Sequence, residues 1–549
     1  MHELAENKNY DAIVIGSGLG GLATAAFLAK IKNLRVLVLE RHYVPGGFTH
    51  SFKRPGGFEW DVGVHYVGLM GPGYKERALF DFVTDGNLDW QRMPEPVDVL
   101  DYPDLQIPLY SDENVQRRQL IKLFPREKAA ILNYYRDLKI AERWGIMNFI
   151  AGTLPRPVSA LIRLILKRAG KLALLTTEQY IEQSFNDPKL KAVVSSQWLA
   201  YGLTPSQSAF GLHAAVVRHY FKGGYFPKGG AGQIAKTIID VIKSSGGDVK
   251  INHEVARIVM DGNKAVGVEV KTREKGADCL QTIYAPAIIS DAGIGNTFSK
   301  FLAPETAGLT HERLSELCKA PSAVSLYLGL KKSPATLGFK GENHWIFPGF
   351  DHEDNVAGGE LLNGIAPAGH LSFPSLKGNQ QSKHTAEFFS VIDIEKFSQW
   401  QGGQWKKRGE SYNKLKQNIT TTMLDLIEAR HPGFQDLVEY SELSTPLSVQ
   451  HFMDHPNGAI YGLPGTPDKF RQNWLKAKSP IPNLYLTGAD LLCVGIVPAL
   501  LSGAATAGAI MGPFGFLKVM LAATRRKKDA EPIEPNHQIA GATTQKDAV

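Results

Sequence analysis

The chain has 549 residues, which is too long for a single hydrophobic core, so two or three domains are expected. Its composition, with 43% hydrophobic and 21% charged residues, is that of a globular protein. A net charge of +7 is small for this length and no compact basic and aromatic cluster accompanies it, so we expect no nucleic-acid partner. The chain has three widely spaced cysteines, Cys279, Cys318 and Cys493. They form neither a disulfide framework nor a Cys-x-x-Cys motif, and no metal site is expected.

The start of the chain carries no targeting pattern. Its first eleven residues are polar and a predicted strand begins at Ala12, which leaves no room for a secretory signal. No uninterrupted run of about 18 apolar residues is present, so a standard transmembrane helix is not expected. These features predict a cytoplasmic protein.

The segment from Asp11 to Gly47 organises the rest of the chain. Ala12 to Ile15 predicts a buried parallel strand, followed by the loop Gly16-Ser17-Gly18-Leu-Gly20-Gly21 and a helix rich in Ala and Leu. A second apolar strand ends at Glu40, 19 residues after Gly21. In a βαβ dinucleotide site the glycines allow a tight turn and a close approach to pyrophosphate, while the acid accepts hydrogen bonds from the adenosine ribose. A glycine-rich turn without a ligand is the alternative.

The residues after this unit distinguish between nucleotides. Glu40 disfavours a 2′-phosphate, so FAD or NAD is expected rather than NADP. Arg41 and the pair Gly46-Gly47 resemble the second fingerprint of glutathione-reductase-like flavoproteins, which favours FAD.

Ionisable residues gather directly downstream. Phe58 to Val67 alternates apolar and polar positions, as a strand passing a ligand does. His65 and Tyr66 lie near its end, and His50 lies before it. Each is either close to the cofactor or a hydrogen-bonded structural side chain.

The region from 90 to 224 is predicted to be mainly helical. Val158 to Thr176 is an amphipathic helix whose apolar face contains Leu161, Ile162, Ile165, Leu172 and Leu175, with several Lys and Arg residues beside it. It is either a helix on the domain surface or one that lies on anionic lipid.

The nucleotide domain is expected to resume after residue 224. A helix opens at Gly229 to Gly232 and continues to Ile242, and short strands follow through Ser290. Val255, at the start of one strand, is placed to touch the adenine through its backbone.

Residues 301 to 479 are irregular and mixed, with strands expected at Ala323 to Leu330 and Glu387 to Ile392 and a helix from about Tyr412 to Ala429. Four of their aromatic side chains either line an apolar cavity or belong to the core: Trp345, Phe373, Phe389 and Phe452. A strand from Asn483 then ends at Gly488 and Asp490, and a helix begins near Val497. Its N-terminus is expected at the flavin, with a helix that only caps the domain as the alternative. Gly512 to Thr524 is a broken apolar segment that is a second candidate for lipid contact, and the polar remainder is expected to be disordered.

These patterns predict an α/β fold, a Rossmann-type FAD-binding domain of the glutathione-reductase kind interleaved with a mixed α+β substrate domain. The expected boundaries are FAD-binding parts at 1–90, 225–300 and 480–524, substrate parts at 91–224 and 301–479, and a tail at 525–549. The expected cofactor-binding residues are Gly16, Ser17, Gly18, Gly20, Gly21, Glu40, Arg41, Gly46, Gly47, Val255, Gly488, Asp490 and Val497.

Several separate motifs together resemble the retinol saturase (all-trans-retinol 13,14-reductase) family, with carotenoid isomerases and phytoene desaturases as wider kin. They are the nucleotide loop, PGGFTHSF, GFEWDVGVHYVG, HYFKGGYFPKGG and LTGADLLCVG. The animal members begin with a secretory leader that is not seen here, which suggests a bacterial-type relative acting on an isoprenoid or polyene lipid.

The resemblance implies non-covalent FAD and the addition of two hydrogens across a carbon–carbon double bond, as hydride from the flavin and a proton from an acid. Candidate acids are His65, Tyr66, His213, His219 and Tyr220, of which His65, Tyr66 and His219 are our catalytic candidates. A desaturase or isomerase of the same fold is the main alternative, and a non-enzymatic prenyl-lipid carrier is a distant one. Because no second glycine fingerprint is present, NADH or NADPH is expected as a transient electron donor, or a separate protein in its place. The hydrophobic substrate and the amphipathic helix predict peripheral association with the cytoplasmic face of a membrane.

Overall fold

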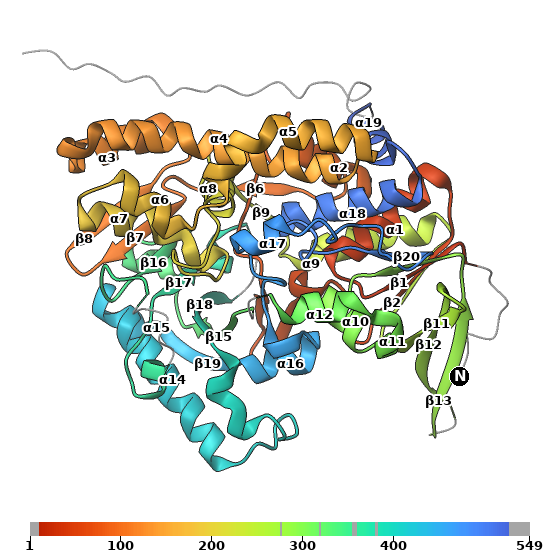
Figure 1. Ribbon diagram of the computed structural model, residues 1–549. Coiled ribbons are helices and arrows are strands. Elements are labelled where there is room, and N and C mark those ends of the chain that lie inside the picture. The colour runs from red at the N-terminus through yellow and green to blue at the C-terminus, as the bar shows by residue number, and fades with distance from the viewer. Residues whose placement is uncertain (1–9, 275–276, 318–319, 354–358, 379–382, 526–549) are drawn as a thin grey trace, which may run out of the picture.

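A computed structural model describes residues 10–525, apart from 275–276, 318–319, 354–358 and 379–382. Figure 1 shows two sheets side by side beneath a layer of helices, with the strands labelled β1, β2 and β20 on the right and β15 to β19 on the left. The predicted tail at 525–549 lies outside the described residues, except for Arg525.

The first sheet has five parallel strands in the order β10-β2-β1-β14-β20. Their bounds are Ala12–Ile15 for β1, Val36–Leu39 for β2, Asp248–Lys250 for β10, Ala287–Ser290 for β14 and Leu484–Leu486 for β20. Because strands far apart in sequence pair in one sheet, the nucleotide domain is assembled from three stretches of the chain, in agreement with the predicted α/β class.

Alternate residues of this sheet enter two different cores. Val14, Val36 and Val38 pack against helices α1 (Leu19–Lys32), α9 (Gly232–Ser244), α18 (Ile496–Ile510) and α19 (Gly515–Arg525). Ile13, Ile15 and Leu37 face the opposite layer, which contains the antiparallel strands β11 (Glu254–Asp261), β12 (Lys264–Glu274) and β13 (Ala277–Tyr284). Both faces are therefore covered, as expected for β-branched parallel strands.

The second sheet has seven strands in the order β19-β15-β18-β17-β16-β7-β8. Its strands are β7 (Asp98–Tyr102), β8 (Leu105–Leu109), β15 (Ser322–Leu330), β16 (Asn343–Ile346), β17 (Gly369–Ser372), β18 (His384–Ile392) and β19 (Val438–Ser444). One face packs against α14 (Glu410–Arg430) through a buried aliphatic and aromatic core. The strands predicted at Ala323 to Leu330 and Glu387 to Ile392 form β15 and β18, and the helix predicted from Tyr412 to Ala429 forms α14. The rest of the region 301–479, predicted to be irregular, supplies three further strands of this sheet.

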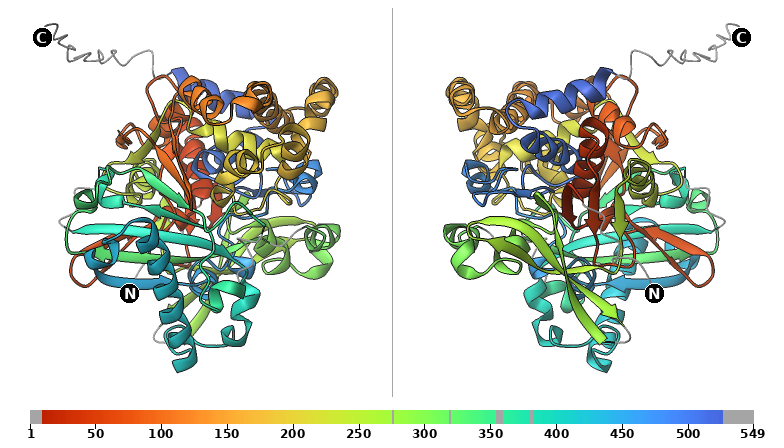
Figure 2. Two further views of the ribbon diagram at one scale, coloured as in Figure 1. Left: turned by 90° about the vertical axis from the view of Figure 1, so that its left-hand side faces the viewer. Right: turned by 90° about the vertical axis from the view of Figure 1, so that its right-hand side faces the viewer.

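A helical layer covers the other side of this sheet and spans both halves of the molecule (Figures 1 and 2). Its members are α2 (Lys75–Val83), α3 (Glu113–Leu123), α4 (Lys128–Gly152), α5 (Arg156–Ala173), α6 (Thr177–Ser184), α7 (Pro188–Ser195) and α8 (Phe210–His219). The remaining helices are α10 (Ile294–Ser299), α11 (Pro304–Ala307), α12 (Leu309–Ser315), α13 (Gly359–Leu362), α15 (Phe434–Leu437), α16 (Pro446–Met453) and α17 (Pro467–Arg471).

Small sheets connect the two halves: β3 (Ser51–Arg54) pairs with β4 (Phe58–Asp61), and β5 (Val67–Gly68) joins β9 (Gly224–Pro227) and β6 (Trp90–Arg92). The strand predicted over Phe58 to Val67 was therefore wrong in its second half. The chain leaves strand geometry after Asp61 and passes irregularly through Val62 and Gly63 along a cavity. Neighbouring side chains in that segment need not alternate between two faces.

Candidate functional site

One cavity lies where the carboxyl ends of β1, β2, β14 and β20 meet β15 and β18 of the second sheet. In open α/β sheets, ligands bind outside the carboxyl ends of the parallel strands. Most of the predicted cofactor residues line this cavity: Gly16, Ser17, Gly18, Gly20, Glu40, Arg41, Gly46, Gly47, Val255, Gly488 and Asp490.

The glycine loop has no space for side chains. Gly16 has a φ of +95°, which favours glycine. A Cβ on Gly18 would lie 2.5 Å from Asp291 Oδ2, and one on Gly20 would lie 2.7 Å from the backbone nitrogen of Gly488. Helix α1 begins within this glycine motif, at Leu19, so its first backbone N–H groups are offered to a ligand in the cavity.

Glu40 is fixed at the end of β2. Its Oε2 accepts hydrogen bonds from the backbone and hydroxyl of Ser17 at 2.9 and 2.7 Å, and its Oε1 accepts one from the His42 backbone at 2.7 Å. The carboxylate is buried but lines the cavity. This is the position from which an acid accepts hydrogen bonds from ribose hydroxyls in βαβ sites.

The segment after Glu40 folds back over the loop. Gly46 has a φ of +114° and donates its N–H to Ser17 Oγ at 3.1 Å, while Gly47 has a φ of +54°. Arg41 donates from Nη1 to the backbone oxygens of His451 and Phe452 at 3.1 and 3.2 Å. Arg41 thus connects the nucleotide domain to α16 at the rim of the cavity.

The C-terminal segment completes the wall. Asp490 Oδ2 accepts the Ile294 N–H at 2.8 Å, and Oδ1 accepts the Leu463 N–H at 2.7 Å. The N-terminus of α18 lines the cavity through Gly495 and Ile496. Val497 and Gly21 are not among the lining residues: Val497 packs in the core, and a Cβ on Gly21 would lie 2.7 Å from the Gly16 oxygen.

Asp291 belongs to the cavity wall although it is not among the predicted cofactor-binding residues. It follows β14, and its Oδ2 is buried and has no hydrogen-bond partner within the described part of the chain. Burial, with the charges of Glu40 and Asp490, raises its pKa to about 8. An acid directly after a second sheet strand, opposite the glycine loop, is the signal that could have identified it.

The three catalytic candidates occupy different positions. His65 lines the cavity, and its ring stacks on that of Phe389 with centroids 5.2 Å apart. Tyr66 points elsewhere and donates its hydroxyl to Asp98 Oδ2 at 2.9 Å. His219 accepts the Gly68 N–H at its Nε2, 2.9 Å away, and like Tyr66 it is not a lining residue.

The other candidate residues also lie in different surroundings. His213 is buried in the helical layer between the hydroxyls of Tyr134 and Tyr201, and Tyr220 stacks on Tyr66. His50 lines the cavity and its Nδ1 donates to the Gly47 oxygen at 2.6 Å. Among the four aromatic residues, Phe389 and Phe452 line the cavity, whereas Trp345 and Phe373 are core side chains.

Buried charged groups lie directly behind His65. Glu387 Oε2 is 3.1 Å from His65 Nδ1, and Lys377 Nζ donates to the His65 oxygen at 3.0 Å. Lys377 also donates to Ser372 Oγ at 2.6 Å and to Asn343 Oδ1. Neither Glu387 nor Lys377 was identified from the sequence. A Glu in the middle of the apolar strand HTAEFFSVI was the available signal.

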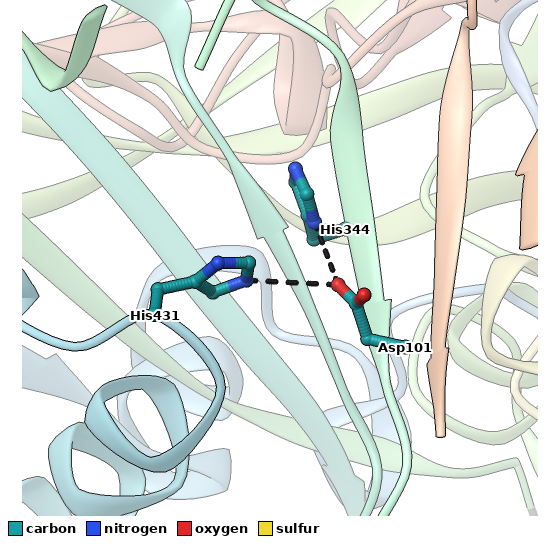
Figure 3. Close-up of side chains that lie close together, drawn as sticks. All are labelled: Asp101, His344 and His431. Carbon is teal, nitrogen blue, oxygen red and sulfur yellow. Dashed lines mark hydrogen bonds and ion pairs between the residues drawn. The ribbon is translucent and has the colours of Figure 1, made fainter. Parts of the chain in front are cut away.

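A second cluster of ionisable groups lies farther along the same sheet. Asp101 from β7, His344 from β16 and His431 after α14 converge, as Figure 3 shows. Asp101 Oδ2 lies 2.6 Å from His344 Nδ1 and 3.6 Å from His431 Nε2. The sequence analysis expected no metal site, and no sequence pattern brings these three residues together.

The predicted amphipathic helix forms α5, but its apolar residues divide between two faces. Leu166, Ala169 and Leu172 pack against the helical core, while Leu164 and Ile165 are exposed by 68% and 73%. Helix α19 lies along the same side of the molecule in Figures 1 and 2 and exposes Leu517 and Leu521. Among the described residues, no helix has both the length and the apolar character needed to cross a membrane.

Comparison with known proteins agrees with this architecture. Residues 14–85 match the model of an NAD(P)-binding Rossmann-like domain. The chain is 34% identical over 540 residues to the all-trans-retinol 13,14-reductase of Danio rerio, covering 92% of this chain and 86% of that protein. It is 26% identical to prolycopene isomerase 2 of an Oncidium hybrid cultivar, covering 94% and 86%. A solved putrescine oxidase has a TM-score of 0.61 at 15% identity, covering 92% of this chain and 99% of the oxidase, which shows a shared fold.

Proposed function

This chain belongs to the all-trans-retinol 13,14-reductase family, and on that premise we propose that it is an FAD-dependent oxidoreductase that reduces a carbon–carbon double bond of a hydrophobic polyene. The observation that carries the proposal is that one cavity is lined both by the dinucleotide loop and by apolar side chains. Phe389 lines it where its ring stacks on His65, and Phe452 lines it beside Arg41. A polyene is apolar along its length and needs this kind of surface.

The residues of the cavity fit FAD. The side-chain-free cradle at Gly18 and Gly20 accepts a pyrophosphate, Glu40 accepts the adenosine ribose, and the α18 N-terminus faces the place of the flavin ring. Bound FAD would supply hydride transfer to the substrate. The chain itself positions the substrate, excludes water and supplies a proton. Of the catalytic candidates, His65 is the one in the cavity wall.

Reduction of a polyene also requires an electron donor. We propose transient NADH or NADPH, with a separate reductase as the second candidate, because the glycine loop after β1 is already assigned to FAD. Anaerobic mixing of the FAD-loaded protein with each nicotinamide separates these candidates. Bleaching of the flavin by NADH or NADPH supports the first, and no bleaching by either supports a protein donor.

The first test is an absorption spectrum of the purified protein, followed by anaerobic reduction and addition of retinol or a carotenoid. A yellow protein whose bleached flavin is reoxidised by the polyene supports the proposal. A colourless protein that cannot be reconstituted with FAD contradicts it. Product mass then separates the reactions: saturation adds two hydrogens, desaturation removes two and isomerisation leaves the mass unchanged.

We further propose that α5 and α19 form a membrane-facing surface through which the polyene arrives. Leu161, Leu164 and Ile165 protrude from α5, beside the exposed basic residues Lys167 and Arg168. Exposed aliphatic side chains next to basic ones are typical of helices that lie in an anionic lipid interface.

Cosedimentation with vesicles containing anionic lipid tests this surface. The double variant Leu164→Glu/Ile165→Glu should lose vesicle binding, and added salt should weaken binding of the wild type. Leu280→Glu is the control, because this residue is 62% exposed and its strand, β13, lies on the side of the molecule away from α5 (Figure 1). Equal binding by all three proteins would contradict the proposed surface.

A further inference from the structure

The cavity wall at His65 is backed by a carboxyl group that is almost completely buried. Glu387 lies on β18 and is 3% exposed. Its Oε1 accepts the Asp61 N–H at 3.1 Å, and its Oε2 lies 3.1 Å from His65 Nδ1. Within the described part of the chain neither His65 Nδ1 nor Glu387 Oε2 makes a hydrogen bond, and their 3.1 Å separation is short enough for one when the two groups are aligned. Each atom therefore has only the other with which to share a proton.

The surroundings determine which group holds that proton. Burial raises the pKa of Glu387 to about 8, although Lys377 and the Asp61 N–H oppose the shift. Burial, reinforced by Lys377, lowers the pKa of His65 to about 3. At neutral pH the carboxyl is protonated and the imidazole is neutral, which avoids two buried charges.

Other ionisable groups surround the pair. Burial and the charge of Glu387 raise the pKa of Asp61 to about 7, and its Oδ1 accepts hydrogen bonds from Ser51 Oγ and the Ala231 N–H. Tyr327 lies opposite Glu387 in the strand register of β15 and β18, and the His370 ring lies 5.0 Å from that of His65. The amino group that faces the pair is that of Lys377, whose pKa burial lowers to about 7 although Glu387, Asp98 and Asp61 oppose the shift.

The contact also fixes the tautomer of His65. If the Glu387 hydroxyl donates to Nδ1, the neutral ring carries its hydrogen on Nε2. His65 is itself part of the cavity wall, so this hydrogen is available to a molecule bound there. A neutral imidazole is a weak acid, but it becomes an effective donor when its second nitrogen gains a proton as the first one leaves.

We propose that Glu387 is the positioning and proton-supplying residue for His65 in the reduction of the polyene. This inference rests on the function proposed above. The Nε2–H bond of His65 breaks as the new C–H bond forms, and Nδ1 takes the hydroxyl proton of Glu387. Bound reduced flavin would supply the hydride and its electron pair. Between turnovers water in the cavity protonates His65 Nε2, and Nδ1 returns its proton to the Glu387 carboxylate, which restores both groups.

The main test compares Glu387→Gln with wild type. Gln keeps the size and can donate a hydrogen bond, but it cannot give up a proton. We expect reoxidation of the reduced flavin by the polyene to slow by about 10²-fold to 10⁴-fold, the usual contribution of a general acid. Bleaching of the flavin by the electron donor and the substrate KM should be unchanged. Wild-type reoxidation should decline above pH about 8, and this decline should be absent from the variant.

A second measurement does not depend on activity. The infrared difference spectrum of wild type minus Glu387→Gln should contain the carbonyl stretch of one buried protonated carboxyl, lost in a titration with a midpoint near 8. The bands of Asp61 and Asp291, whose pKa values are also raised, are common to both proteins and cancel in this difference. Glu442→Gln on β19 is the matched control. Hydrogen bonds from Arg54 hold the pKa of Glu442 below its usual value despite burial, so this variant should retain the band.

Nitrogen NMR of the wild type with labelled histidine covers the case in which the variant does not fold. The neutral Nε2–H tautomer at His65 is expected at pH 7, and an Nδ1–H tautomer would overturn the proposal. Reoxidation by Glu387→Gln within about 2-fold of wild type would also overturn it, since a general acid contributes far more. If the protein binds no flavin, the proposed function fails, while the infrared and NMR results still report on the Glu387–His65 pair.

Discussion

Two buried histidine–carboxylate pairs occur in the second sheet region, and they hold their protons differently. His65 and Glu387 are 3.1 Å apart at the cavity, and His344 and Asp101 are 2.6 Å apart at the other cluster. At the first pair the pKa of the histidine is lowered and that of the acid is raised. At the second pair both shifts have the opposite sign. The same two residue types therefore form a neutral pair in one place and an ion pair in the other.

The number of opposite charges and donors around each pair explains the difference. Burial would raise the pKa of Asp101, but hydrogen bonds from His344 and His431, with a further one from Gln106, hold it well below its usual value. Burial would likewise lower the pKa of His344, but Asp101 and Glu342 raise it.

Glu387 lacks such support. It has the Asp61 N–H and one imidazole, and a second buried acid lies beside it. Lys377, the cation of this region, gives its hydrogen bonds to the oxygens of His65, Ser372 and Asn343. Burial therefore prevails at Glu387, whereas charge pairing prevails at Asp101. A neutral pair can release a proton into a cavity at little electrostatic cost. An ion pair instead stabilises the contact between the strands that carry it.

The largest expected effect is on turnover. His65→Phe keeps the ring that stacks on Phe389 but removes both nitrogens, so polyene reduction should fall by about 10²-fold to 10⁴-fold. His344→Gln should lower the rate of polyene reduction by far less, because His344 does not line the cavity. Single-turnover reoxidation of reduced flavin measures both. Equal losses would show that the two pairs do not differ in the way described.

The next largest effect is on stability, and here the change at the Asp101–His344 pair should cost more than the change at the Glu387–His65 pair. Asp101→Ala leaves His344 and His431 without their shared acceptor and should lower the free energy of unfolding by about 3–5 kcal/mol, as expected when one partner of a buried ion pair is removed. Glu387→Gln replaces a neutral group by a neutral group and should cost about 1 kcal/mol. Urea titrations at pH 5 with saturating FAD compare them, and a larger loss for Glu387→Gln would reverse the assignment of charges.

The dependence of stability on pH should also separate the pairs. The pKa of His344 is raised by folding, so its contribution is complete below pH 6.5 and is lost as pH rises through the folded pKa. The pKa of Glu387 rises from 4.5 to about 8, so the unfolded chain releases this proton first and stability falls as pH rises from about 4.5 to 8.

Variants of each pair should therefore respond in distinct ways. His344→Gln should be most destabilising at pH 5, with a gap to wild type that narrows at higher pH. Glu387→Gln should be close to wild type at pH 5 and more stable than wild type at pH 8. Thermal unfolding across this range measures both trends, and a Glu387→Gln curve parallel to wild type would contradict a raised pKa.

The nucleotide half was predictable because its signals are local. The strand, glycine loop, helix and acid from Ala12 to Glu40 follow one another, and the structure places them as the pattern predicts. His65 and Tyr66 could not be separated, since which way each side chain points depends on the break in strand geometry after Asp61. Glu387 and Lys377 were missed because they reach His65 only through a sheet built from distant segments. The amphipathic pattern of α5 was recognised, but which apolar residues are buried depends on its packing against α4 and α8.

The smallest expected effect concerns metal. Asp101, His344 and His431 are residue types that bind Zn²⁺, and their ligand atoms lie within 4.8 Å of one another. However, two atoms that both lie about 2.1 Å from a tetrahedral ion are about 3.4 Å apart, and Asp101 Oδ2 is 2.6 Å from His344 Nδ1. A metal would also have to displace the proton that the raised pKa retains on His344. Addition of Zn²⁺ should therefore leave the unfolding temperature unchanged in both wild type and His431→Ala. A rise in wild type alone would show that this ion pair opens to coordinate metal, and the contrast between the two pairs would then be one between a proton site and a metal site.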